Sequence, residues 1–150
     1  MKQRSTRREF CAQACGAAGI VALSSVLESC GSPGGATATL PVLTGTAGSG
    51  VVTLAIDAGS PLASVGAAAL VRSSNGTFLV ARTGAEAFSA LTSICTHETC
   101  TITGFDAADY VCPCHGSRFG TSGAVLSGPA TRPLRAFQTR FADNLLTIVL

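Results

Sequence analysis

Short apolar runs recur along the chain at a spacing that suits β-strands better than long helices. Most of the runs are bounded by Gly, Asn, Asp or Pro, residues that commonly end strands. Two predicted chain reversals support this pattern, because Asn75-Gly76 and Asp143-Asn144 tolerate the backbone of tight hairpins. The pattern predicts an all-β fold with strands at 51–56, 67–71, 77–81, 87–94, 136–141 and 145–150.

The strand rhythm stops between Cys95 and Pro133, where cysteine, histidine, glycine and proline replace the alternation of apolar and polar residues. Strand-rich segments at about 40–93 and 134–150 flank this insert. We therefore expect a β base formed by the flanking segments and a small subdomain, about 94–133, built from loops. Since the reactive residue types gather in the insert, we expect the chemistry there.

Composition and charge narrow the class of protein. The chain has 17 glycines, no tryptophan and only 12% charged residues, which suits many short strands and turns. The net charge is +2, but four of the ten basic residues lie in the first ten positions, and six arginines face six acids from Gly31 onward. The part expected to fold is close to neutral, so nucleic acid is not an expected partner.

The first 30 residues resemble an export signal. Arg7-Arg8 followed by Phe10 resembles the twin-arginine motif of proteins that are exported folded. The apolar stretch 11–27 is short and weakly apolar for a transmembrane helix. We expect a location on the extracytoplasmic, periplasmic side of the bacterial cytoplasmic membrane, with an ordinary Sec signal as the alternative.

Cys30 is a candidate lipid-attachment site. The sequence Leu27-Glu28-Ser29-Cys30 resembles a lipobox, although Glu28 is atypical at its position, and a retained or cleaved signal is the alternative. Residues 31–39 are rich in Gly, Ser, Ala and Thr and predict a flexible linker. Residues 40–150 remain for the folded domain.

Two short segments combine cysteine with histidine. Cys95, His97 and Cys100 lie in the first, and Cys112, Cys114 and His115 lie in the second. Each loop can offer a thiolate and an imidazole, so together they predict a metal site. Zinc accepts the same four ligands, and ligand count alone does not decide between zinc and iron.

The two segments, Cys95-Thr96-His97 and Cys112-Pro113-Cys114-His115-Gly116-Ser117, resemble the Rieske family, most closely its cytochrome bc and bf type. The resemblance covers about residues 60–150 and implies an antiparallel β-sandwich with a cluster-binding subdomain that holds one 2Fe-2S cluster. It makes Cys95 and Cys112 ligands of one iron and His97 and His115 ligands of the other. It also implies a disulfide between Cys100 and Cys114.

The resemblance extends to the surroundings of the cluster and departs there at residues 98 and 119 and in the stretch 131–134, which follows the proline-loop segment. It implies that Ser117 hydrogen-bonds a cluster sulfur and that 128–130, Gly-Pro-Ala, is a proline loop covering the cluster. Phe119 stands where high-potential members carry tyrosine, and Glu98 stands where quinol-oxidising members carry leucine. By the match His115 would contact quinol, with His97 beside it.

The resemblance implies one-electron transfer, with an iron-sulfur subunit of a membrane quinol-oxidising cytochrome bc-type complex as the expected setting. The expected partners are redox proteins such as cytochrome b and cytochrome c, quinol, and the membrane, and the chain alone is not expected to be a complete enzyme. Alternatives are the small Rieske subunit of an arsenite oxidase-like enzyme, a dioxygenase ferredoxin, which the export signal and Cys100 and Cys114 disfavour, and a zinc-binding structural module.

Overall fold

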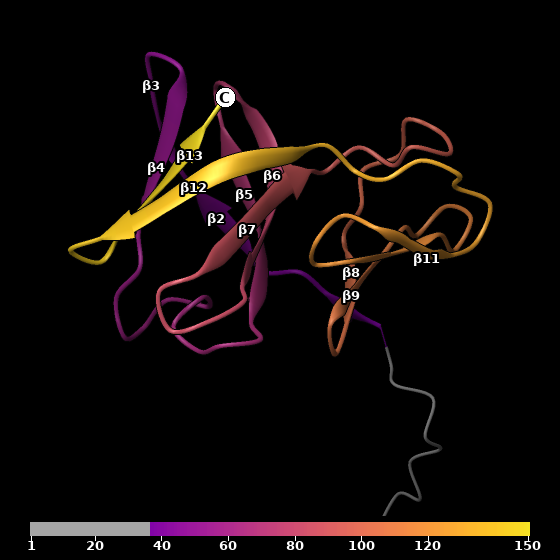
Figure 1. Cartoon of the computed structure of the whole chain (residues 1–150), viewed down its shortest axis with the longest axis horizontal. Coiled ribbons are helices and arrows are strands. Elements are labelled where there is room, and N and C mark those ends of the chain that lie inside the picture. The colour runs from indigo at the N-terminus through magenta and orange to yellow at the C-terminus, as the bar shows by residue number, and fades with distance from the viewer. Residues whose placement is uncertain (1–36) are drawn as a thin grey trace, which may run out of the picture. The chain divides into compact units, whose positions relative to one another are not determined.

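The computed structural model describes residues 37–150, which form thirteen β-strands and no helix (Figure 1). The predicted export signal, Cys30 and most of the predicted linker lie outside these residues. Residues 37–150 contain no helix with the length and apolar character needed to cross a membrane. The all-β prediction is confirmed.

Eight strands form the larger sheet, whose order is β2-β5-β6-β7-β12-β13-β4-β3. All neighbouring pairs are antiparallel except β2 and β5, which are parallel. The strands are β2 (Val42–Thr44), β3 (Thr46–Gly48), β4 (Val51–Ala55), β5 (Ala68–Ser73), β6 (Gly76–Arg82), β7 (Phe88–Thr92), β12 (Ala136–Ala142) and β13 (Leu145–Val149). All eight strands lie within 40–93 and 134–150, the two segments expected to form a β base.

The first of two apolar cores lies on one face of β5 to β7. Val52 on β4 and Leu146 and Ile148 on β13 meet alternate residues of β5, β6 and β7, including Val71 and Val80. All five of these side chains are almost entirely buried. Burial of apolar surface is the main favourable term in folding. This core therefore accounts for the packing of β4 and β13 against β5, β6 and β7.

The opposite faces of β5 to β7 are buried as well. Leu70, Leu79 and Leu91 belong to a second core that also contains Cys95 and Cys112. Strands buried on both faces read as continuous apolar runs rather than as an alternation. The second core therefore attaches the cysteine-bearing segments to the base through apolar packing.

The second sheet has five short strands in the order β1-β8-β9-β10-β11. They are β1 (Ala38–Thr39), β8 (Gly104–Asp106), β9 (Asp109–Val111), β10 (Arg118–Gly120) and β11 (Val125–Ser127). Four of them fall in the subdomain that we expected to be built from loops. Strands of three residues complete too little of the alternation to be read from sequence, which explains this difference.

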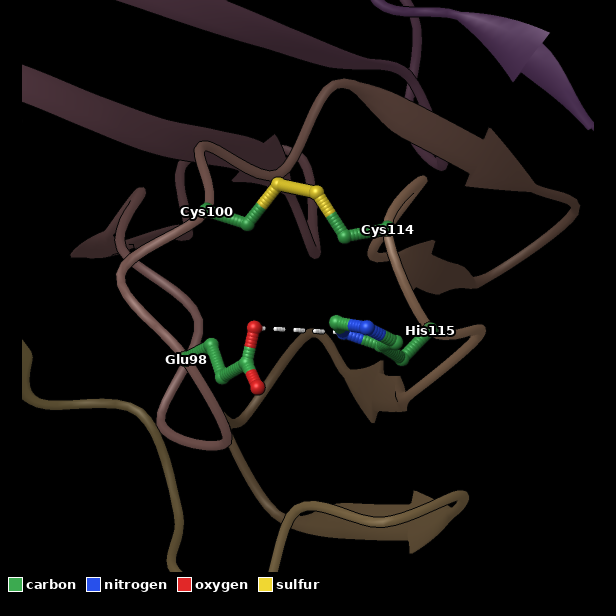
Figure 2. The surroundings of a disulfide bond; sticks show 4 residues. All are labelled: Glu98, Cys100, Cys114 and His115. Atoms are coloured by element: carbon green, nitrogen blue, oxygen red, sulfur yellow. Dashed lines mark ion pairs between the residues drawn. A yellow bond between two sulfur atoms is a disulfide. The ribbon is translucent and has the colours of Figure 1, made fainter.

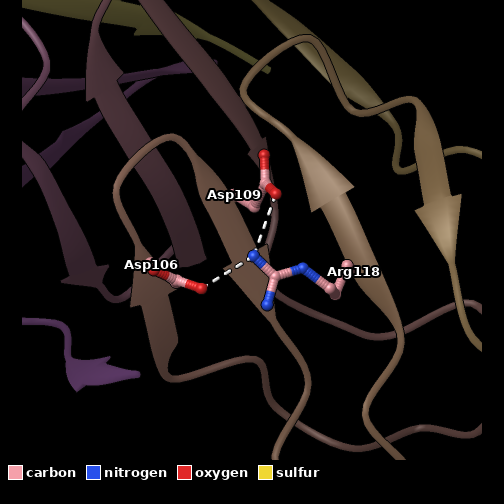
Figure 3. A network of polar contacts seen from close by, with 3 residues as sticks. All are labelled: Asp106, Asp109 and Arg118. Carbon is pink, nitrogen blue, oxygen red and sulfur yellow. Dashed lines mark hydrogen bonds and ion pairs between the residues drawn. The ribbon is translucent and has the colours of Figure 1, made fainter. Parts of the chain in front are cut away.

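An ion-pair network fastens the second sheet on its more exposed face (Figure 3). Nη2 of Arg118 on β10 lies 2.9 Å from a carboxylate oxygen of Asp106 on β8 and 3.0 Å from one of Asp109 on β9. The hydrogen bonds that Arg118 donates to these two carboxylates raise its pKa. One guanidinium thus joins β8, β9 and β10, and the last two of these strands flank the second cysteine-histidine segment.

The six strands expected from the apolar runs are all present, with boundaries shifted by one or two residues. The β12–β13 turn uses positive φ at Asp143 and Asn144, as the turn signal predicted, whereas in the β5–β6 turn only Gly76 has positive φ. Ala38 and Thr39, the end of the predicted linker, pair with β8.

Candidate metal centre

The first cysteine-histidine loop follows β7. Ile94 and Thr101 form an isolated antiparallel bridge, and the Cys95 N–H donates to the Cys100 carbonyl at 2.9 Å. These contacts close residues 95–100 into a compact loop. Cys95 is buried at its base, and His97 and Glu98 are exposed at its tip.

The second loop connects β9 and β10. The Cys112 N–H donates to the Ser117 carbonyl at 2.9 Å, and the Gly116 N–H donates to the Cys112 carbonyl at 3.0 Å. Gly116 has φ of 72°, a conformation that glycine adopts without steric cost. The turn leaves Cys112 and Ser117 buried and exposes His115.

A disulfide between Cys100 and Cys114, the pair implied by the resemblance, joins the two loops (Figure 2). A second contact between the loops lies beside it, where a carboxylate oxygen of Glu98 is 3.7 Å from Nδ1 of His115. Both of these side chains are exposed. The disulfide therefore fixes the distance between the loops, and Glu98 adds a negative charge next to the histidines.

The segment 128–130 lies against the second loop. The Ala130 N–H donates to the Ser117 hydroxyl at 3.1 Å. Gly128 has φ of 93°, and a Cβ there would lie 2.6 Å from the Ser117 Cα, so no larger residue fits without moving the backbone. The Thr96 hydroxyl donates to the Arg132 carbonyl at 2.6 Å, which holds this segment to the first loop as well.

Cys95 and Cys112 are the free cysteines of residues 37–150, and both are buried. Burial is the main cause that raises the pKa of the Cys112 thiol, and the neighbouring Cys95 thiol, which shares a hydrogen bond with it, raises it further. Hydrogen bonds from the backbone N–H groups of Cys114 and His115 act in the opposite direction. The two sulfurs are thus side by side, with two amide donors facing one of them.

The two imidazoles also lie side by side. The ring centroids of His97 and His115 are 4.9 Å apart, and the rings are nearly perpendicular. The site accordingly has a buried pair of thiols and an exposed pair of imidazoles, one of each kind from each loop.

These donors suit an iron-sulfur cluster with mixed ligands. Thiolates and imidazoles are the two ligand types of a Rieske 2Fe-2S centre. Ligand atoms of Cys100, Cys112 and Cys114 also lie within 4.8 Å of one another. However, Cys100 and Cys114 form the disulfide and have no thiolate to offer. The thiols that can bind metal here are those of Cys95 and Cys112.

The sequence analysis missed one residue next to this centre. Tyr110 on β9 is fully buried in the core that contains Cys95 and Cys112, and burial raises its pKa. Its hydroxyl has no hydrogen-bond partner among residues 37–150. A single tyrosine beside a cysteine segment gave no pattern that could have identified it.

Comparison with known proteins gives the class of the protein. The model of the Rieske [2Fe-2S] domain matches residues 59–138, which is more than half of the chain and includes both cysteine-histidine loops. The chain belongs to the Rieske family. The family's cofactor is one 2Fe-2S cluster, as predicted, and this favours iron over the zinc site that the donor set alone left open.

Curated relatives point to one branch of the family. The cytochrome b6-f complex iron-sulfur subunit of Chlorobaculum thiosulfatiphilum is 35% identical over 63 residues, which are 41% of this chain and 35% of that protein. The cytochrome b6-f complex iron-sulfur subunit 2 of Nostoc sp. (strain PCC 7120) is 43% identical over 56 residues, which are 36% of this chain and 31% of that protein. The match spans about a third of the length of these relatives.

Solved structures agree on the fold. The plasma membrane Rieske protein PetC3 from Synechocystis PCC 6803 has a TM-score of 0.50 and 30% identity, covering 55% of this chain and 86% of that one. The ferredoxin of carbazole 1,9a-dioxygenase from Nocardioides aromaticivorans has a TM-score of 0.52 at 20% identity, covering 65% and 96%. The second similarity supports the fold alone.

Proposed function

We propose that Cys95 and Cys112 bind one iron of the cluster, that His97 and His115 bind the other, and that the chain transfers single electrons through it. The observation that carries this proposal is the pairing of two buried free thiols with two exposed imidazoles on loops joined by a disulfide. When bound, the cluster accepts and releases one electron.

The residues around the proposed ligands would tune that exchange. Neutral imidazoles in place of two anionic thiolates make the centre less negative, which raises its reduction potential. The Ser117 hydroxyl accepts from the Ala130 N–H and still has its own proton to donate. A hydrogen bond from Ser117 to a sulfur would stabilise the reduced state.

The side from which an electron donor approaches follows from which residues of the site are exposed. The thiols are buried under the loops, whereas His97 and His115 are exposed. An electron donor would therefore approach from the imidazole side. We propose that this donor is a quinol and that the acceptor is a cytochrome, as in a cytochrome bc-type complex, a setting supported by the names of the curated relatives.

Adding quinol to membranes that contain the oxidised protein is expected to reduce the Rieske centre within the turnover time of the complex. The measurement is the electron paramagnetic resonance signal of the reduced centre. A chemical reductant, dithionite, gives the signal of the fully reduced sample for comparison. A centre that dithionite reduces but quinol does not would contradict the quinol-oxidising setting and leave the electron-transfer proposal standing.

We also propose that residues 1–30 direct export to the extracytoplasmic side and that Cys30 carries a lipid. The support is the order of the motifs, a twin-arginine pair, a weakly apolar stretch and a cysteine before a Gly-rich segment. The disulfide adds to it, since such bonds persist in oxidising compartments.

The variant Cys30→Ala is expected to release the domain into the soluble extracytoplasmic fraction or to accumulate as an unprocessed precursor, because the lipid-bearing sulfur is gone. Fractionation followed by mass spectrometry of the N-terminus gives the answer. Unchanged processing together with unchanged membrane attachment would contradict the lipid anchor.

A further inference from the structure

We propose that the carboxylate of Glu98 lowers the reduction potential of the iron-sulfur centre, so that the site requires a more strongly reducing electron donor. The inference rests on the cluster ligation proposed above. It assigns a tuning role to an exposed residue outside the proposed ligand set.

The backbone of the first loop fixes where this charge lies. Glu98 directly follows His97, one of the proposed ligands, and consecutive Cα atoms are only about 3.8 Å apart. The Cys100 N–H donates to the Glu98 carbonyl at 2.7 Å, and the disulfide joins Cys100 to Cys114 of the second loop. The carboxylate therefore stays near both loops in any rotamer of its side chain.

The side chain of Glu98 points toward the second histidine. Its carboxylate faces the ring of His115 beside the disulfide, with an oxygen 3.7 Å from Nδ1 (Figure 2). One potential ligand atom each of His97, Glu98 and His115 lies within 4.8 Å of the other two, and all three residues are exposed. A negative charge thus lies directly beside the exposed side of the proposed centre.

No cation in the described part of the chain pairs with this carboxylate. The only ion-pair contact of Glu98 within residues 37–150 is the one with His115. The guanidinium of Arg118 is bonded to two aspartates on neighbouring strands. The subdomain 94–133 has three acids and two arginines, a net charge of −1 with neutral histidines: Glu98, Asp106, Asp109, Arg118 and Arg132.

The effect on the potential follows from Coulomb repulsion. Reduction adds one negative charge to the centre, and a fixed negative charge nearby makes this step less favourable. The Glu98 side chain is 64% exposed, so water screens the repulsion and keeps it small. We expect an equilibrium constant for reduction about threefold lower than without the charge, which is about 28 mV for a one-electron couple. At a fixed ambient potential fewer centres are then reduced, and the donor has to be correspondingly more reducing.

The test compares Glu98→Gln with Glu86→Gln in the full chain purified with its cluster. Both variants replace an exposed carboxylate by an amide of the same size, but Glu86 is in the β6–β7 turn, and β7 lies between it and the first loop. In redox titrations at low ionic strength the potential of Glu98→Gln should be about 28 mV higher than that of the unmodified protein. Glu86→Gln should leave it unchanged. Equal potentials for Glu98→Gln and the unmodified protein would overturn the proposal.

Salt separates an effect of charge from an effect of loop structure. The Debye length falls from about 30 Å at 0.01 M to about 3 Å at 1 M ionic strength, so the difference between Glu98→Gln and the unmodified protein should shrink as salt is added. The charge reversal Glu98→Lys should raise the potential about twice as much at low salt. A difference that does not change with salt would mean that the substitution acts through the shape of the loop, and the proposal would be wrong.

Iron and labile sulfide are measured in every sample of this series. Their absence from the unmodified protein would overturn the cluster ligation itself, and the inference with it. A full complement of iron and sulfide without a shift in potential would overturn the role of Glu98 alone. Chemical mediators equilibrate the centre in these titrations, so the result does not depend on quinol being the donor.

Discussion

The variant Cys112→Ala is expected to fold without iron or acid-labile sulfide. Cys112 is one of the two free cysteines of residues 37–150, and it is buried where two backbone N–H groups face its sulfur. A thiolate at this position is held by amide dipoles and by the loop geometry, and alanine can offer no ligand in its place. Loss of the cluster should be complete, and Cys95→Ala should have the same effect.

The matched control removes the other two cysteines of the same loops. A Cys100→Ala, Cys114→Ala double variant loses two sulfurs that are already committed to the disulfide, so it should still assemble a cluster. Iron and labile sulfide analysis together with the visible absorption spectrum distinguish the two results. A full complement of iron and sulfide in Cys112→Ala would contradict the assignment of Cys112 as a ligand.

The second large effect concerns how long the cluster is retained. The disulfide closes a loop with a sequence separation of 14 residues, and a cross-link of this size contributes about 3 kcal/mol to the free energy of unfolding in the chain-entropy model. The double variant should therefore lose that amount of stability as an apoprotein. Its cluster should also bleach faster, because the two loops can then separate.

The measurements are urea denaturation of the apoprotein and the decay of visible absorption of the holoprotein in mild denaturant. The unmodified protein is the reference, and mass spectrometry after alkylation shows whether its Cys100 and Cys114 are oxidised. Two free thiols in the native protein would contradict the disulfide. Equal bleaching rates would mean that the loops are held by their other contacts.

Those other contacts are two hydrogen bonds to the segment 128–132. The Thr96 hydroxyl bonds to the segment at Arg132, and the Ser117 hydroxyl bonds to Ala130. They link three segments that lie far apart in sequence, and each is a single hydrogen bond, worth about 1 kcal/mol. The disulfide is the strongest single link between the first two loops.

The sequence predicted six of the eight strands of the larger sheet because these strands follow simple physical rules. Strands β5 to β7 have cores on both faces and read as unbroken apolar runs. The turn at Asp143 and Asn144 uses residues that tolerate positive φ. The parallel pairing of β2 with β5 has no such local signal, since it depends on a contact between distant segments.

The sequence grouped the residues of the candidate site but did not give their arrangement. Spacing placed four cysteines and two histidines in two segments, and only the resemblance to the Rieske family distinguished the proposed ligands from Cys100 and Cys114. The five-stranded sheet that carries the second loop was missed because its strands are two or three residues long. The network of Arg118 with Asp106 and Asp109 was missed for the same reason, as it depends on the register of those strands.

Tyr110 shows a further limit of sequence reasoning. A tyrosine in an apolar core is normally explained by its packing, and nothing in the residues next to it indicates that its hydroxyl lacks a partner. Within the described residues, only the structure reveals that this hydroxyl has no hydrogen-bond partner.

The central claim is that Cys95, His97, Cys112 and His115 hold one 2Fe-2S cluster. The most direct measurement is the content of iron, acid-labile sulfide and zinc in the full chain, purified without oxygen from cells that assemble such clusters. Two irons and two labile sulfides per chain, with no stoichiometric zinc, are the predicted result. One zinc per chain without labile sulfide would contradict the claim.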